Sequence, residues 1–252
     1  MNRAAYKLGK KVAVHDSRAL LFADYVRHSS LPAPPFHQNW AALASTAWGM
    51  MANDSAGDCT CAAAGHAIQT WTANTGSELT IPDDAVIAAY SAVTGYVPGV
   101  PSSDNGAVEL DVLNYWRKTG IGGQKIAAFM ALEPGNLDHV KLAIDLFGGL
   151  YIGARLPLSA QTQRVWSLAP GGPVGNSAPG SWGGHAMWVV SYDTAGCAVV
   201  TWGGLQRITW GWFSTFVDEA YAVLPEALWA NSGHLSPSGF AFDDLQQDLA
   251  LL

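Results

Sequence analysis

The chain has 252 residues, 49% of them hydrophobic and 13% charged, which is enough to bury one core or two packed lobes. Its net charge of -7 and its 13 Lys and Arg residues give no basic stripe to neutralise phosphates, so we expect no nucleic acid partner. No apolar stretch is long enough for a membrane span or a secretory signal, and three cysteines are too few for a disulfide framework. We therefore expect a cytoplasmic protein that binds no membrane, and the oligomeric state stays open.

The first half of the chain predicts an arm followed by helices. Residues 1–48 are predicted to form an N-terminal arm with a short helix near residues 18–26. The prolines of "SSLPAPPF" end this helix. The strongest helix runs from Asp58, as a capping residue, to Gly76 in "DCTCAAAGHAIQTWTANTG". Three further helices are predicted at residues 82–94, 106–119 and 136–147.

After residue 148 the pattern changes to short segments rich in β-branched and aromatic residues, which predict an antiparallel sheet. The expected strands are residues 149–158, 185–193, 197–203, 205–210 and 219–224. Residues 167–184 form a Gly/Pro/Ser loop too long for a simple connection, which is typical of a loop that lines a site. We therefore predict an α+β fold over residues 49–224, with a helical lobe to about 148 and a sheet lobe at 149–224. Residues 225–252 form a tail with a helix from about Asp243.

The cysteines allow three interpretations. Cys59 and Cys61 could bind zinc with His66 and either Cys197 or His185, but a second close cysteine pair is absent. Both could instead be small hydrophobic residues in a buried helix. In the third interpretation, Cys59 lies in the first turn of a helix, where the helix dipole lowers the thiol pKa and favours a nucleophilic thiolate. Cys61 is rotated by about 200° from Cys59 and faces elsewhere.

A thiolate nucleophile needs a base, and His185 is the strongest candidate among the histidines. It opens a predicted strand directly after flexible glycines, so its side chain can lean over a sheet edge. His66 lies roughly 10 Å from Cys59 along the same helix, too far for a hydrogen bond, and is expected to be a packed residue. We expect Cys59 to be ionised at the mouth of a groove, close to the His185 imidazole.

This order of a cysteine on a helix N-terminus, a helical lobe and a histidine opening a late sheet resembles the papain-like cysteine peptidase superfamily, over most of residues 50–224. In that family a glutamine six residues before the nucleophile donates to the oxyanion, and Asn53 stands at that offset here. The family's Asn-Ser-Trp-Gly segment aligns with Trp202, but its asparagine is replaced by Val200 or Thr201, of which only Thr201 can hydrogen-bond an imidazole. "Gly-Asp-Cys-Thr-Cys" replaces the family's Cys-Gly-Ser-Cys-Trp signature, which indicates a distant relative.

The resemblance implies a papain-like fold and a thiol-dependent hydrolase or acyl transferase. Such an enzyme attacks an amide or ester carbonyl of a small-molecule or peptide substrate through a Cys-His pair and a thioester, without metal or cofactor. The expected catalytic residues are Cys59, His185, Asn53 and Thr201, and the expected substrate-binding residues are Trp182, Gly183, Gly184 and Trp202. The alternative is a papain-fold structural or binding protein without catalysis, for example one associated with a phage or another particle.

Overall fold

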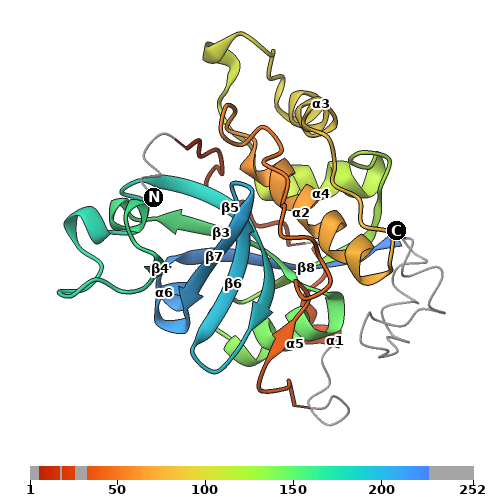
Figure 1. The fold of residues 1–252 in the computed structure, drawn as a ribbon. Coiled ribbons are helices and arrows are strands. Elements are labelled where there is room, and N and C mark those ends of the chain that lie inside the picture. Colours follow the sequence, from red (N-terminus) through yellow and green to blue (C-terminus); the bar gives the residue numbers. More distant parts are fainter. Residues whose placement is uncertain (1–5, 18, 26–32, 227–252) are drawn as a thin grey trace.

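A computed structural model describes residues 6–17, 19–25 and 33–226, and these form an eight-stranded sheet with helices on both faces (Figure 1). The helices are α1 (Phe22–Tyr25), α2 (Cys59–Asn74), α3 (Asp83–Thr94), α4 (Glu109–Lys118), α5 (Leu137–Phe147) and α6 (Trp210–Phe216). The strands are β1 (Gln38–Asn39), β2 (Ile126–Leu132), β3 (Leu150–Leu156), β4 (Val165–Trp166), β5 (Gly183–Tyr192), β6 (Gly196–Thr201), β7 (Gly204–Thr209) and β8 (Val217–Pro225). The tail helix predicted from Asp243 lies outside the described residues.

The strand order is β2-β8-β3-β5-β6-β7-β4, with β1 on β5. The sheet pairs are antiparallel except β4 with β7, which is parallel. The predicted α+β arrangement of helices and a largely antiparallel sheet is confirmed.

The two faces of the sheet pack against different helices because side chains alternate along each strand. In β5, Trp188 and Val190 join α2, α3 and α4 in one hydrophobic cluster. Met187 and Val189 point the other way, into a cluster with α5 and α6. Figure 1 shows α2, α3 and α4 gathered on one side of the sheet and α5 on the other. This packing fixes the N-terminus of α2 against β5, where the site lies.

Several elements differ from the sequence prediction, β2 and α6 most of all. Strand β2 lies inside the stretch expected to be helical, and it pairs with β8 through Ala128 and Leu224. Its sequence "IAAFMAL" has weak intrinsic strand preference, so the pairing with β8 decides its conformation. The predicted strand 205–210 ends at Thr209, whose side chain accepts the Trp212 N–H and caps the short helix α6.

Candidate active site

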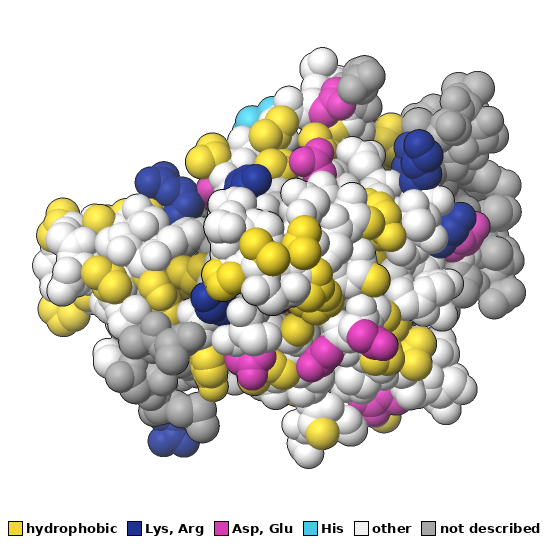
Figure 2. All heavy atoms as spheres, turned by 90° about the horizontal axis from the view of Figure 1, so that it is seen from above, with side chains coloured by type: hydrophobic (Ala, Val, Ile, Leu, Met, Phe, Trp, Pro, Cys, Tyr) yellow, Lys and Arg dark blue, Asp and Glu magenta, His cyan; other side chains and the backbone are white. Residues whose placement is uncertain are grey.

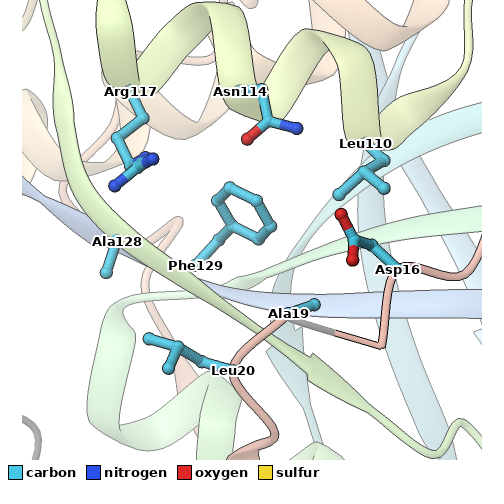
Figure 3. A pocket seen from close by; sticks show the side chains of 8 residues that line it. All are labelled: Asp16, Ala19, Leu20, Leu110, Asn114, Arg117, Ala128 and Phe129. Atoms are coloured by element: carbon cyan, nitrogen blue, oxygen red, sulfur yellow. The ribbon is translucent and has the colours of Figure 1, made fainter. Parts of the chain in front are cut away.

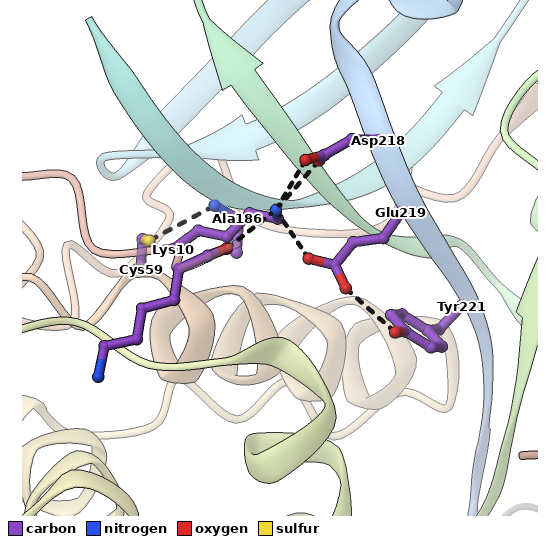
Figure 4. A network of polar contacts seen from close by, with 7 residues as sticks. Lys10, Cys59, Ala186, Asp218, Glu219 and Tyr221 are labelled. Atoms are coloured by element: carbon purple, nitrogen blue, oxygen red, sulfur yellow. Dashed lines mark hydrogen bonds and ion pairs between the residues drawn. The ribbon is translucent and has the colours of Figure 1, made fainter. Parts of the chain in front are cut away.

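Cys59 is the first residue of α2, as the sequence predicted, and its side chain faces the sheet. Its Sγ accepts the backbone N–H of Ala186 in β5 at 3.4 Å (Figure 4). Ala186 directly follows His185, so this contact joins the thiol to the strand that carries the histidine, across 127 positions in sequence. The structure thus brings the two main predicted residues into the same part of the fold.

His185 is held by two neighbours. Its Nε2 lies 2.7 Å from Thr201 Oγ1, and its ring stacks on the Trp202 indole with centroids 4.2 Å apart and planes at 17°. Its Nδ1 has no hydrogen-bond partner among the described residues. The imidazole is therefore fixed through one nitrogen and one face, and Nδ1 can accept a proton in the tautomer that carries hydrogen on Nε2.

Trp202 owes its position to an uncommon backbone conformation. It follows the last residue of β6 with φ of 46°, in the left-handed region that costs free energy for a residue with a side chain. The Trp182 ring lies 5.5 Å from the Trp202 ring, centroid to centroid. The predicted residues Thr201 and Trp202 therefore contact His185, and the predicted residue Trp182 lies beside Trp202.

Asn53 and Asp58 differ from their expected roles. The Asn53 Nδ2 group donates to the Ala56 carbonyl at 3.2 Å and to Asp58 Oδ1 at 3.1 Å. Both amide hydrogens are thus engaged, and Asn53 as placed offers none to an oxyanion. Asp58 occupies the N-cap position of α2, but its carboxylate accepts from Asn53 and from no N–H of the helix. Asn53 therefore supports the buried Asp58.

A segment near the start of the described residues crosses the site. We call residues 6–11 the strap. The Lys10 N–H donates to the Gly184 carbonyl at 3.1 Å, the Ala107 N–H donates to the Gly9 carbonyl at 2.8 Å, and the Lys11 N–H donates to the Ala107 carbonyl at 2.9 Å. A Cβ atom at Gly9 would overlap the Gly57 carbonyl group. The strap therefore passes between Gly57, just before Cys59, and Gly184, just before His185.

The outer end of the strap rests on Trp202. The indole Nε1–H of Trp202 donates to the Lys7 carbonyl at 3.1 Å, and the Tyr6 ring lies 5.2 Å from the Trp202 ring. A Cβ at Gly183 would come within 2.8 Å of Leu8, and a Cβ at Gly184 would overlap the Lys10 carbonyl. The glycines expected to bind substrate thus contact the strap in this structure.

The strap seals the thiol and the imidazole, whereas the sequence led us to expect both at an open groove. Cys59 and His185 are each 1% exposed. Burial raises the pKa of the Cys59 thiol to about 12, although hydrogen bonds from the backbone of Ala186 and Gly9 oppose the shift. Burial also lowers the pKa of His185 to about 3. The prediction of a thiolate is therefore wrong for this closed form, because desolvation outweighs the helix dipole.

The remaining cysteines and His66 lie in the core. Cys59, Cys61 and Cys197 are all free and buried. The His66 Nε2 lies 2.8 Å from the Gly49 carbonyl oxygen, as expected of a packed histidine. Within the described part of the chain, no three His, Cys, Asp or Glu side chains are placed to hold a metal ion, so the zinc interpretation finds no site there.

Among the hollows on the surface of the described residues, two bear on the position of the site. One of about 330 Å³ lies between α4 and β2 and is lined by Asp16, Asn114, Arg117 and Phe129, among others (Figure 3). The other, of about 710 Å³, is lined by residues that include Tyr6, Thr201 and Trp202. The second hollow therefore continues the site beyond the strap, whereas neither Cys59 nor His185 lines the first.

The distribution of basic side chains and the character of the helices relate to the expectation of no nucleic acid or membrane partner. On the face seen in Figure 2, Lys and Arg side chains lie apart and do not merge into a stripe. None of the helices in the described residues combines the length and the apolar character that crossing a membrane requires. The absence of a nucleic acid or membrane partner stays a prediction.

Comparison with known proteins identifies the fold as papain-like. Xylellain, a cysteine protease from Xylella fastidiosa, superposes with a TM-score of 0.66 at 16% identity, over 87% of this chain and 96% of that one. ProCathepsin B S9 from Trypanosoma congolense gives 0.59 at 12% identity, over 89% and 88%. Digestive procathepsin L 3 of Tenebrio molitor gives 0.55 at 13% identity, over 88% and 76%. No family model and no curated protein matches the sequence. The fold resemblance expected from the motif order is thereby confirmed.

Proposed function

We propose that the chain is a thiol-dependent hydrolase or acyl transferase, and that the strap holds it in a closed form. The observation that carries the proposal is the contact of Cys59 Sγ with the N–H of Ala186, next to His185. The unpartnered Nδ1 of the buried His185 adds a proton acceptor to the same site. The cysteine protease neighbours support a cysteine hydrolase at this coarse level.

The proposed reaction proceeds through a thioester. His185 Nδ1 takes the proton of the Cys59 thiol, and the thiolate attacks the substrate carbonyl carbon. The protonated imidazole then returns the proton to the leaving amine or alcohol as its bond to carbon breaks. Water or an amine, deprotonated by the same imidazole, attacks the thioester carbonyl; the C–S bond breaks, and the imidazole returns the proton to the departing Cys59 sulfur. The backbone N–H of Cys59, at the start of α2 where helix N–H groups lack partners within the helix, stabilises the oxyanion.

The strap supports a peptide as substrate. It lies extended between the two lobes, and its backbone groups pair with Ala107 on one side and Gly184 on the other. Backbone pairing of this kind binds extended peptides largely without regard to their side chains. When the strap is displaced, the same groups at Ala107 and Gly184 are available to a substrate.

The test uses a chain in which the strap is displaced. We expect Gly9→Ala to do this, because the new Cβ would overlap the rigid Gly57 backbone. In that chain we expect hydrolysis of a panel of p-nitrophenyl esters and fluorogenic peptide amides. Adding Cys59→Ser should reduce the rate at least about a thousandfold. The matched control is Cys61→Ser, which changes another buried thiol two residues away and should retain the rate. Equal rates in the two thiol variants would refute the proposal.

The non-catalytic alternative keeps one observation in its favour, the sealed thiol whose pKa is raised to about 12. Iodoacetamide titration of the Gly9→Ala chain separates the two functions. Alkylation of Cys59 that persists well below pH 8.5, the ordinary range of a free thiol, favours the enzyme. A titration at or above that value favours a binding or structural protein.

A further inference from the structure

The Lys10 side chain enters a buried acidic pocket beside the site. Its Nζ lies 2.7 Å from Glu219 Oε1 and 3.0 Å from Asp218 Oδ1, and it donates to the Lys11 carbonyl at 3.2 Å. Figure 4 shows Lys10 reaching from the strap to these two carboxylates at the start of β8. The Lys10 side chain is 1% exposed, whereas that of Asp218 is 25% exposed. Asp218 therefore marks the mouth of the pocket.

Glu109 forms another wall of this pocket and is not satisfied by Lys10. It is fully buried at the start of α4, and neither of its carboxyl oxygens has a hydrogen-bond partner in the described residues. A Cβ atom at Gly153 would overlap the Lys10 stem and lie 2.6 Å from Glu109 Oε1. The absence of a side chain at Gly153 thus creates the space that holds the Lys10 methylenes next to Glu109.

The pocket holds more carboxyl groups than ammonium groups. A single ammonium faces the carboxyl groups of Glu109, Asp218 and Glu219, and Tyr221 OH donates to Glu219 Oε2 at 3.1 Å. Burial alone would lower the pKa of Lys10, but the charges of Glu109 and Glu219 outweigh it and raise that pKa. Burial also raises the pKa of Glu109 and of Glu219. A cluster of acidic side chains buried here without a cation would lower the stability of the fold, so the pocket favours a bound cation.

We propose that the Glu109–Asp218–Glu219 pocket is a specificity site for a lysine-type side chain of the substrate, occupied in the closed form by Lys10 of the strap. The inference rests on the proposed function, because it names the substrate side chain that the same cleft selects. Gly9 packs against the backbone of Gly57, two residues before Cys59, and Lys10 is the next residue of the strap. The pocket therefore selects the side chain of the residue next to the one whose backbone lies near Cys59.

The first experiment asks whether the pocket accepts a free cation, independently of catalysis. Lys10→Ala removes the resident ammonium, and n-butylammonium supplies a stem and head of matching size. We expect saturating n-butylammonium chloride to raise the melting temperature of the Lys10→Ala chain by about 3 °C, and neutral n-butanol not to. The matched control is Lys11→Ala, at the exposed neighbour, which n-butylammonium should not stabilise. Equal shifts in the two variants would overturn the proposal.

The second experiment asks whether the pocket selects peptides, and it keeps Lys10 intact in case its removal prevents folding. In the Gly9→Ala chain, the acetylated peptide amide Leu-Gly-Lys-Val is compared with the same peptide carrying norleucine in place of lysine. Each peptide is also tested with its sequence reversed. We expect the lysine peptide to protect Cys59 from iodoacetamide at about tenfold lower concentration than the norleucine peptide. Glu219→Gln should reduce this ratio to less than about threefold, whereas Glu226→Gln, at an exposed carboxylate near the end of β8, should leave it unchanged.

The outcomes separate this inference from the proposed function. Lysine-selective protection without hydrolysis of either peptide would remove the proposed function and keep the pocket. Hydrolysis of both peptides with equal protection would keep the enzyme and overturn the pocket. A lysine preference that survives Glu219→Gln would also overturn it, because the selectivity would then arise elsewhere in the cleft.

Discussion

The imidazole Nε2 of His185 lies 2.7 Å from the hydroxyl oxygen of Thr201, so a hydroxyl takes the place where the resemblance leads one to expect an amide. In a neutral imidazole only one nitrogen carries hydrogen, and Thr201 can accept from Nε2. That tautomer leaves Nδ1 as the acceptor, which is the form the proposed reaction needs. In the proposed reaction Thr201 is therefore a positioning residue, acting through the histidine.

Thr201→Val should weaken the proposed reaction without removing the pair. The valine keeps the shape of the side chain but leaves Nε2 without a buried partner, so both the tautomer and the ring orientation are less fixed. In the Gly9→Ala chain we expect turnover to fall about 10- to 100-fold, with a changed pH profile, and Thr201→Ser to restore most of it. A rate loss of the same size in the serine variant would show that packing, and not the hydroxyl, is what matters.

Displacing the strap should make Cys59 reactive. The pKa of about 12 in the closed form leaves little thiolate at neutral pH, and a solvent-exposed thiol has a pKa near 8.5. The difference corresponds to about three-thousandfold more thiolate, so Gly9→Ala should accelerate alkylation of Cys59 at pH 7.5 by up to that factor. Peptide mapping by mass spectrometry measures the rate at each cysteine. Gly135→Ala, at a site where an added Cβ meets no atom within 4 Å, is the control, and a matching acceleration there would contradict the role of the strap.

Most of the helices and strands, and the place of Cys59, could be predicted because they depend on local signals. Helix α2 begins at Cys59 after an acidic residue, and β5 carries His185 after two glycines, as the sequence indicated. Thr201 could be placed because the alignment on Trp202 leaves only Val200 and Thr201 at that position, and only Thr201 can hydrogen-bond an imidazole. The fold class followed from the switch between helical and strand-like patterns near residue 148.

The closed state of the site could not be predicted, because it depends on contacts far apart in sequence. Nothing local to residues 6–11 marks them as occupants of a cleft, and their partners Ala107 and Gly184 lie about 100 and 170 positions away. Glu109 falls within the helix predicted at residues 106–119, and no local signal shows that it is fully buried beside Lys10. The pocket is recognised by a buried lysine surrounded by carboxylates, and only the tertiary structure brings these residues together.

Asn53→Ala should destabilise the chain. The Asn53 amide is the hydrogen-bond partner of Asp58 Oδ1, and Asp58 Oδ2 has no partner among the described residues. Removing the amide leaves a buried carboxyl group without its donor, which should lower the free energy of unfolding by about 1–3 kcal/mol. Urea denaturation measures the loss, and Asn53→Ala/Asp58→Ala should recover part of it. A stability loss near zero combined with a hundredfold slower reaction would instead restore Asn53 as an oxyanion donor.

His66 should make stability fall in acid. Burial lowers its pKa to about 4 in the folded chain, from an ordinary value of 6.5. Between these values the unfolded chain binds a proton that the folded chain does not, so the free energy of unfolding decreases as the pH falls from 6.5 toward 4. The shift corresponds to about 3 kcal/mol at full extent. His66→Gln removes this contribution, so its loss of stability between pH 7 and pH 4 should be smaller by about that amount, whereas His15→Gln, at an exposed histidine, should follow the native chain. Parallel losses in the native chain and His66→Gln, measured by urea denaturation, would mean that His66 already accepts a proton in the folded state.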